Sequence, residues 1–307
     1  TIDRVLVQGY GLAALAANLC SRLTRTPTFM LVCSPVERYY ECRREHPLPG
    51  LPFKARELWG LRLLARMNAR LGRHYVVLSE HLAQVVRGHG TSRPISVVPV
   101  YGVDTTVFSP RGEDRSTIRR RKGLPEWGSL LFFSSRVAPE KDTDTLLEAL
   151  KRLANAGRDV RLLHRSGGYR DFLQLARAKR VADRLIATDA VHPNLELADD
   201  YRACDICIQA SREEGLGFSV LEALACEVPV IASAVGGLRE TIINGETGWT
   251  YPPGDSGALA DRIEEVLEKP AEARRRAARG RAMVTERYES RVAFDRLAKL
   301  LVGSEAT

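Results

Sequence analysis

Short runs of β-branched and other apolar residues alternate with helix-like patterns along nearly the whole chain. Eight of these runs predict strands, at residues 4–8, 28–33, 75–79, 95–98, 130–134, 160–164, 205–209 and 228–232. Helical periodicity lies between them, at residues 12–23, 57–71, 144–155, 172–182 and 219–225. Such alternation is typical of βαβ units with parallel sheets buried on both faces. We therefore predict an α/β fold.

The alternation is interrupted between residues 100 and 123, where Gly102, Pro110, Gly112 and a basic run replace it. Glycine and proline punctuate structure, so this stretch is the best candidate for a linker. After Asp255 the pattern is almost entirely helical. We expect two Rossmann-like halves followed by a helical tail.

The composition indicates an ordinary globular protein but does not distinguish one kind of enzyme from another. The 307 residues suffice for two domains, and 44% hydrophobic with 27% charged residues is ordinary for a globular chain. The formal net charge of +8 favours an anionic small substrate, a membrane surface or nucleic acid as a partner.

The six cysteines mostly lie in apolar runs, which predicts free, buried thiols. Cys204 and Cys207 form a C-x-x-C pair, but no second pair completes a zinc site. We expect no metal and no cofactor.

The most informative segment runs from a strand through a glycine-containing loop into a helix. The loop carries Glu214, Gly215 and Gly217, and Glu222 follows in the helix. Glycines at such a turn let a ligand approach the backbone, and the helix N-terminus offers unpaired N–H groups to a phosphate. The two glutamates could face one ligand from two directions.

The pattern of Ser211, Glu214 and Glu222 resembles the E-x7-E signature of retaining glycosyltransferase family 4, which has the GT-B fold. Residues 98–110, 229–240 and 244–255 resemble further motifs of that family, in the same order. The resemblance implies a retaining, metal-independent glycosyltransferase of the hexosyltransferase type. It would move a sugar from a nucleotide-sugar donor, with UDP as the favoured nucleotide, to an acceptor hydroxyl.

The resemblance also implies a domain division. We expect an incomplete acceptor-side domain at residues 1–107, a donor-binding domain at 108–287, and a helix at 288–307 that crosses back.

A fifth matching segment, residues 131–141, would supply the charges that bind the donor. By resemblance Arg136 and Lys141 bind the diphosphate, Glu214 the sugar hydroxyls and Glu222 the ribose hydroxyls, and we expect Arg136, Lys141 and Glu214 to be catalytic. The expected donor-binding set is Ser135, Arg136, Lys141, Glu214, Gly215, Leu216, Gly217, Phe218, Ser219 and Glu222, with amides near Gly236 and Gly237 in support.

Two residues depart from the family pattern in this segment. Ser135 and Asp142 stand where the family has glycines, and Asp142 would bring a like charge near the diphosphate. Asp142 and Asp144 also mimic a D-x-D metal motif, but Thr145 and Glu148 have the spacing of a helix capping box. Helix initiation is therefore the favoured interpretation.

Two other motifs suggest nucleotide or nucleic-acid binding. Gly9, Gly11 and Ala14 match a dinucleotide-binding fingerprint, but no acidic residue ends the next strand. The arginines between Arg274 and Arg281 lie in a helical pattern without interleaved aromatics, so we favour a solvated face and expect no nucleic acid as a partner.

The acceptor-side half differs most from the family. It is shorter than the family pattern, and Cys33 and Ser34 stand where many members have a histidine. A missing N-terminal segment or a partner chain would account for this and would leave the first strand with an unpaired edge and exposed apolar surface. The alternative functions are a nucleotide-sugar-binding partner subunit without turnover and, less favoured, a sugar-nucleotide epimerase.

The segment from Lys54 to Arg73 predicts an amphipathic helix. Leu61, Leu64, Met67 and Leu71 form the expected apolar stripe, and Arg62, Arg66, Arg70 and Arg73 the basic stripe. Packing against the core is the default interpretation. Contact with a membrane surface is the alternative, which would make a cytoplasmic protein peripheral at the inner membrane face.

Overall fold

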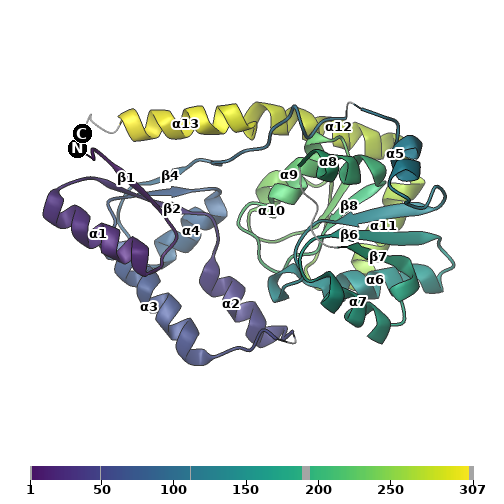
Figure 1. The fold of residues 1–307 in the computed structure, drawn as a ribbon, viewed down its shortest axis with the longest axis horizontal. Helices are drawn as coiled ribbons and strands as arrows, with labels where there is room; N and C mark the ends of the chain where they lie inside the picture. The colour runs from purple at the N-terminus through teal and green to yellow at the C-terminus, as the bar shows by residue number, and fades with distance from the viewer. Residues whose placement is uncertain (1, 49, 111, 189–193, 304–307) are drawn as a thin grey trace.

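The computed structural model describes residues 2–48, 50–110, 112–188 and 194–303, which form two α/β domains bridged by the last helix (Figure 1). The first sheet has the order β1-β2-β3-β4 and consists of β1 (Val5–Gln8), β2 (Thr28–Val32), β3 (His74–Val77) and β4 (Ile95–Val97). All its pairs are parallel; Leu31, for example, lies opposite Val76.

The second sheet is also parallel, with the order β10-β9-β8-β5-β6-β7. Its strands are β5 (Ser129–Phe133), β6 (Val160–Arg165), β7 (Leu185–Thr188), β8 (Ile206–Gln209), β9 (Val230–Ser233) and β10 (Trp249–Tyr251). The strand order reverses between β5 and β8, and open sheets of this kind bind ligands at the carboxyl ends of the strands beside that reversal.

Helices cover both sheets, and the last helix, α13, runs back from the second domain to the first, where it ends near β1 (Figure 1). The first domain contains α1 (Leu12–Thr24), α2 (Val36–Glu45), α3 (Ala55–Leu71) and α4 (Glu80–Gly88). The second contains α5 (Arg115–Arg121), α6 (Thr143–Asn155), α7 (Tyr169–Ala178), α8 (Asn194–Ala203), α9 (Phe218–Ala225), α10 (Leu238–Thr241), α11 (Ser256–Glu268) and α12 (Pro270–Arg287), and α13 spans Ser290–Val302. Short 3₁₀ turns occupy Pro139–Lys141 and Ala182–Arg184.

The predicted α/β class is confirmed, and all eight predicted strands are present with ends shifted by at most two residues. β7 and β10 were not predicted, because each is three or four residues long and shows no extended alternation. α5 lies inside the stretch predicted to be a linker. It is seven residues long and mostly arginine and polar residues, so it shows no clear apolar stripe.

β1 is the edge strand of the first sheet and pairs with β2 alone among the described strands. Leu6 on β1 is 40% exposed, and Leu12, Leu19 and Leu23 on α1 are exposed beside it. The expected unpaired edge and exposed apolar surface are therefore both present.

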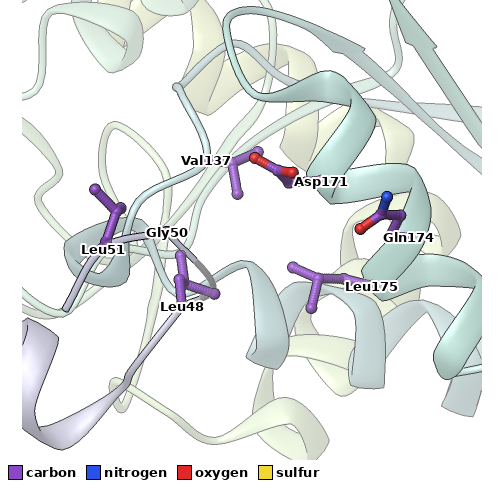
Figure 2. A pocket seen from close by; sticks show the side chains of 7 residues that line it. All are labelled: Leu48, Gly50, Leu51, Val137, Asp171, Gln174 and Leu175. Carbon is purple, nitrogen blue, oxygen red and sulfur yellow. The ribbon is translucent and has the colours of Figure 1, made fainter.

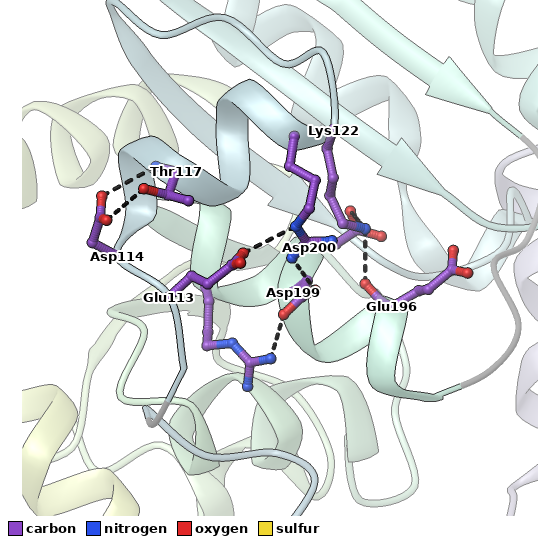
Figure 3. A network of polar contacts seen from close by, with 9 residues as sticks. Glu113, Asp114, Thr117, Lys122, Glu196, Asp199 and Asp200 are labelled. Carbon is purple, nitrogen blue, oxygen red and sulfur yellow. Dashed lines mark hydrogen bonds and ion pairs between the residues drawn. The ribbon is translucent and has the colours of Figure 1, made fainter.

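A polar network fixes α8 against the start of the second domain (Figure 3). Asp199 accepts from Arg121 at 2.6 Å, and the Nζ of Lys122 lies 2.8 Å from a carboxylate oxygen of Asp200. Asp200 is fully buried, and α8 also carries a residue of the candidate site, Tyr201. The network therefore anchors one wall of that site.

Candidate active site

Glu214 lies at the centre of a cluster beyond the end of β8. Its Oε2 is 2.5 Å from the Nζ of Lys141 and 3.0 Å from the Nε2 of Gln209, and it accepts from the hydroxyl of Ser211 at 3.1 Å. The side chains of Lys141 and Glu214 are only 13% and 10% exposed. The fold thus joins two predicted site residues that are 73 positions apart in the chain.

Gln209 holds this cluster together and was not predicted. Its Oε1 accepts from Ser135 at 3.1 Å and from Ser219 at 2.9 Å, while its Nε2 donates to Ser211 at 2.8 Å as well as to Glu214. Ser135, Ser219 and Glu214 are therefore brought to one place. The position of Gln209 as the last residue of a buried strand was the only signal in the sequence.

Gly236 and Gly237 pack against the backbone of the Glu214 loop. A Cβ at Gly236 would lie 2.1 Å from the carbonyl oxygen of Glu214, and one at Gly237 would lie 2.2 Å from that of Gly215. The amide of Gly237 donates to the Glu214 carbonyl at 3.0 Å. This amide is therefore used within the protein to shape the loop, and the support of a ligand by amides near Gly236 and Gly237 stays a prediction.

The N-terminus of α9 presents backbone amides beside Glu214. Gly217 precedes the helix with φ +91°, a conformation that favours glycine. Within the part of the chain that the structure describes, no acceptor is bonded to the amides of Leu216, Gly217 or Phe218. These N–H groups and the helix dipole suit an anion or a sugar hydroxyl.

Glu222 lies further along α9 and accepts from the hydroxyl of Tyr201 at 2.8 Å. Tyr201 is fully buried and its hydroxyl lies 2.8 Å from that of Ser134. Burial raises the pKa of Glu222 to about 7, and the hydrogen bond from Tyr201 opposes that rise. The Glu222 carboxyl is therefore partly protonated and partly ionised near neutral pH.

Arg136 and Asp142 lie at opposite ends of the segment that carries Lys141. Arg136 is 63% exposed and pairs with Glu140 at 2.5 Å. Asp142 is buried, pairs with Arg212 at 3.0 Å and caps α6 by accepting from the amide of Thr145. The predicted helix start is confirmed, but Asp142 is the capping residue, and its charge is neutralised by Arg212 rather than free to repel a diphosphate.

Among the described residues, no group of three or more histidine, cysteine, aspartate or glutamate side chains could hold a metal ion. Asp144 is largely exposed and pairs with Lys179 at 2.6 Å. The six cysteines are unpaired, and four of them are buried.

Contacts between the two domains converge on the loop that carries Glu214. Ser79 donates to the carbonyl of Gly215 at 2.6 Å, and His81 pairs with Glu213 at 2.5 Å. The carboxylate of Glu240 accepts from the amides of Glu80 and His81 at 3.0 and 2.9 Å, so it caps α4 from the other domain. We call Ser79, His81, Glu213 and Glu240 the interdomain clasp.

The first domain also contributes Cys33 and Tyr39 to this region. The Cys33 carbonyl would lie 2.7 Å from a Cβ at Gly215, and the hydroxyl of Tyr39 accepts from the Gly215 amide at 3.3 Å. Burial raises the pKa of the Cys33 thiol. At the position where many family members have a histidine, this chain therefore contributes a close backbone contact.

Comparison with known proteins places these features in a family. A model described as glycosyl transferases group 1 matches residues 114–283. A D-inositol 3-phosphate glycosyltransferase from Geodermatophilus obscurus is 36% identical over 202 residues, which cover 62% of this chain and 44% of that protein. A GDP-mannose-dependent alpha-(1-6)-phosphatidylinositol monomannoside mannosyltransferase from Mycolicibacterium smegmatis is 33% identical over 211 residues, covering 66% and 55%.

The chain therefore spans about half the length of these curated relatives. Among solved structures, HepE from Anabaena in complex with UDP and glucose superposes with a TM-score of 0.81 at 19% identity, covering 98% of this chain and 77% of that one. This likeness confirms the GT-B fold.

Proposed function

The chain belongs to the group 1 glycosyl transferases, and from that premise we propose that it transfers a sugar from a nucleotide-sugar donor to an acceptor hydroxyl. The observation that carries the proposal is the cluster of Lys141, Gln209 and Glu214 beside the amides of the α9 N-terminus. The cluster combines a cation and free N–H groups for a diphosphate with a carboxylate for sugar hydroxyls.

Each charged side chain has a proposed role in donor binding. Lys141 and Arg136 bind the diphosphate, and Glu214 accepts hydrogen bonds from the hydroxyls of the transferred sugar. Glu222 accepts from the ribose hydroxyls, beside Tyr201. The Nζ of Lys141 lies 2.5 Å from Glu214. When a donor binds, this Nζ would contact the phosphates in addition to Glu214. Charge-assisted hydrogen bonds of this kind are short and about twice as strong as neutral ones.

We propose that the reaction retains the configuration of the sugar and needs no metal. The leaving nucleoside diphosphate gains negative charge as the glycosidic bond breaks, and Lys141, Arg136 and the α9 amides would stabilise that charge. The acceptor hydroxyl would attack from the face on which the diphosphate leaves, and a phosphate oxygen would take its proton. A protein nucleophile is not part of this scheme.

The base of the nucleotide is proposed to be uracil, with guanine as the alternative. HepE was solved with UDP, whereas one relative is named as GDP-mannose-dependent. A binding panel of UDP, GDP, ADP and dTDP decides this, because a ligand that binds the folded state raises the unfolding temperature by mass action.

The rival proposal is a nucleotide-sugar-binding subunit without turnover, motivated by the exposed edge of the first domain. The deciding experiment is an assay of nucleotide release from UDP-glucose and GDP-mannose by the purified chain. Release supports the transferase, and tight donor binding without release supports the subunit.

A peripheral membrane contact through α3 is a further proposal. The four arginines of the predicted basic stripe are exposed, and three of the four predicted apolar residues are half-buried, with Met67 38% exposed. The buried face consists of Leu58, Ala65, Asn68 and Ala69, and Trp59 and Leu63 add exposed apolar surface, at 68% and 40%. The outer face of α3 therefore mixes apolar side chains with arginines, which suits an anionic membrane surface. No described helix is long and apolar enough to cross a membrane. Co-sedimentation of the chain with phosphatidylglycerol vesicles, but not with phosphatidylcholine vesicles, would support the proposal, and Trp59→Ser should weaken it.

A further inference from the structure

A cavity of about 400 Å³ lies between α2 of the first domain and the segment that carries Arg136. Tyr39, Tyr40 and Arg43 line it on one side, and Arg136 and Glu140 on the other. Its volume is within the range of small-molecule sites, about 300–1,000 Å³. The cavity thus adjoins a residue proposed to bind the donor, but half of its wall belongs to the other domain.

Arg43 is the distinctive charge of this cavity. Its guanidinium lies over the ring of Tyr40, 4.8 Å from the centroid, and no carboxylate pairs with it in the described part of the chain. The neighbouring arginines of α2 are paired: Arg38 lies 3.6 Å from Glu213, and Arg44 lies 3.3 Å from Glu45. Arg43 is therefore held in place by stacking while its N–H groups remain available.

The side chains that line this cavity carry a net positive charge. Arg136 and Glu140 also line it, and they neutralise each other at 2.5 Å. Arg43 is therefore the uncompensated charge among the lining side chains. A planar guanidinium that is already fixed by an aromatic ring is well suited to bind a phosphate with two parallel hydrogen bonds.

A second cavity of about 420 Å³ continues from the first, because the two share Leu51 and Val137 in their walls. Figure 2 shows Leu48 and Leu51 on one side of it, facing Val137 and Leu175 on the other. Asp171 and Gln174 of α7 supply its polar side chains. This part of the groove is lined mainly by aliphatic groups, which favours an apolar occupant.

We infer that the two cavities bind the acceptor, and that this acceptor carries a phosphate next to an apolar segment. Arg43 binds the phosphate, and the four aliphatic side chains contact the apolar segment. The inference rests on the proposed function, since the donor diphosphate would lie on the other side of Arg136. A soluble polyol phosphate shares the phosphate chemistry but would leave the apolar cavity unused.

The test is calorimetric titration, in the presence of saturating UDP, with three probes: dihexanoyl phosphatidic acid as monomers, glycerol 3-phosphate and glycerol. We expect the lipid phosphate to bind most tightly, glycerol 3-phosphate more weakly and glycerol not at all. Arg43→Gln should weaken both phosphate probes by about tenfold, because a charge-assisted contact is lost. Arg43→Lys should restore part of the affinity, and Arg44→Gln, the matched control, should bind as the wild type does.

A second variant separates the two parts of the groove. Leu175→Ala should weaken the lipid phosphate several-fold and leave glycerol 3-phosphate unchanged. Equal affinity for the two phosphate probes would overturn the apolar part of the inference. Unchanged binding in Arg43→Gln, no binding of any probe, or displacement of the probes by UDP would overturn the inference as a whole. If no nucleotide or nucleotide sugar binds, the proposed function fails, and the same titrations without UDP still decide the role of Arg43.

Discussion

The raised pKa of Glu222 predicts that donor affinity depends on pH, provided that this carboxylate accepts hydrogen bonds from the ribose. With a pKa of about 7, it is roughly one-tenth ionised at pH 6 and nine-tenths ionised at pH 8. The ionised form is the stronger acceptor, so affinity should rise with pH. In the limit that only this form binds, the increase is about tenfold, equivalent to about 1.4 kcal/mol.

The assay is calorimetric titration of UDP-glucose between pH 6 and pH 8. UDP-glucose is preferable to UDP, because its diphosphate is esterified at both ends and does not titrate in this range. Binding should favour the ionised carboxylate and lower its pKa, so about half a proton per ligand should be released at pH 7. Titration in two buffers of different ionisation enthalpy measures that proton directly.

The control is Glu222→Gln, whose amide does not titrate. It should bind UDP-glucose more weakly than the wild type at pH 8, with affinity that is flat across the range. The same pH dependence in wild type and variant would refute the assignment of Glu222 to the ribose.

The free energy of unfolding should also depend on pH through Glu222, and the raised pKa fixes the direction of that dependence. Because burial raises the folded-state pKa of Glu222 above its ordinary value, the folded chain binds more protons than the unfolded chain between about pH 4.5 and 7. The contribution of this group to stability should therefore fall as pH rises through that window, by up to about 3 kcal/mol, and then level off. The difference in unfolding free energy between wild type and Glu222→Gln reports it.

Three further predictions concern the sugar, the clasp and the glycine contacts. Glu214→Gln should weaken UDP-glucose far more than UDP, because the contact is to the sugar; equal losses for both ligands in calorimetry would contradict this. Glu240→Ala removes a charged cap worth about 0.5–2 kcal/mol from α4 and should let the two domains move apart. The radius of gyration measured by solution scattering should then exceed that of the wild type and that of Glu246→Ala, a control in an exposed loop. An unchanged radius would count against the clasp. Gly237→Ala should lower the free energy of unfolding by about 1–3 kcal/mol, because its Cβ would lie 2.2 Å from the Gly215 carbonyl oxygen. Gly88→Ala is the control, since a Cβ there meets nothing within 4 Å. Equal stability of the two variants would refute the packing argument.

Local patterns were sufficient to predict the strands that are buried and the loop that carries Glu214. Alternation identified β5 and β8, and the glycine spacing located the start of α9. Elements with weak patterns could not be found this way. α2, for example, contains six charged residues and contacts the other domain through polar groups such as Tyr39, so its sequence lacks an apolar stripe.

Side-chain contacts that form only in the folded chain could not be predicted from sequence patterns. Tyr201 carries no local signal, and the end of a buried strand is the only one for Gln209, because the roles of both depend on contacts with other segments. Glu240 ends a segment that resembles a family motif, but that motif does not show its contact with α4. The partner of Arg136 was also missed, although Glu140 is only four residues further along the chain, because spacing does not show that a carboxylate occupies the guanidinium proposed to bind phosphate. Spacing identifies which residue types can do the chemistry, whereas tertiary contacts decide which of them are free to act.

The central claim is that Lys141 stabilises the departing diphosphate without a metal. The most direct measurement is nucleotide release from UDP-glucose and GDP-mannose in the presence of EDTA, by the wild type and by Lys141→Ala, with Lys151→Ala as the matched control. We predict undiminished release by the wild type and by Lys151→Ala, and a fall in kcat on the order of 10²–10³ for Lys141→Ala, as for loss of one preorganised charge-stabilising group. Loss of wild-type release in EDTA, or a normal kcat for Lys141→Ala, would contradict the account.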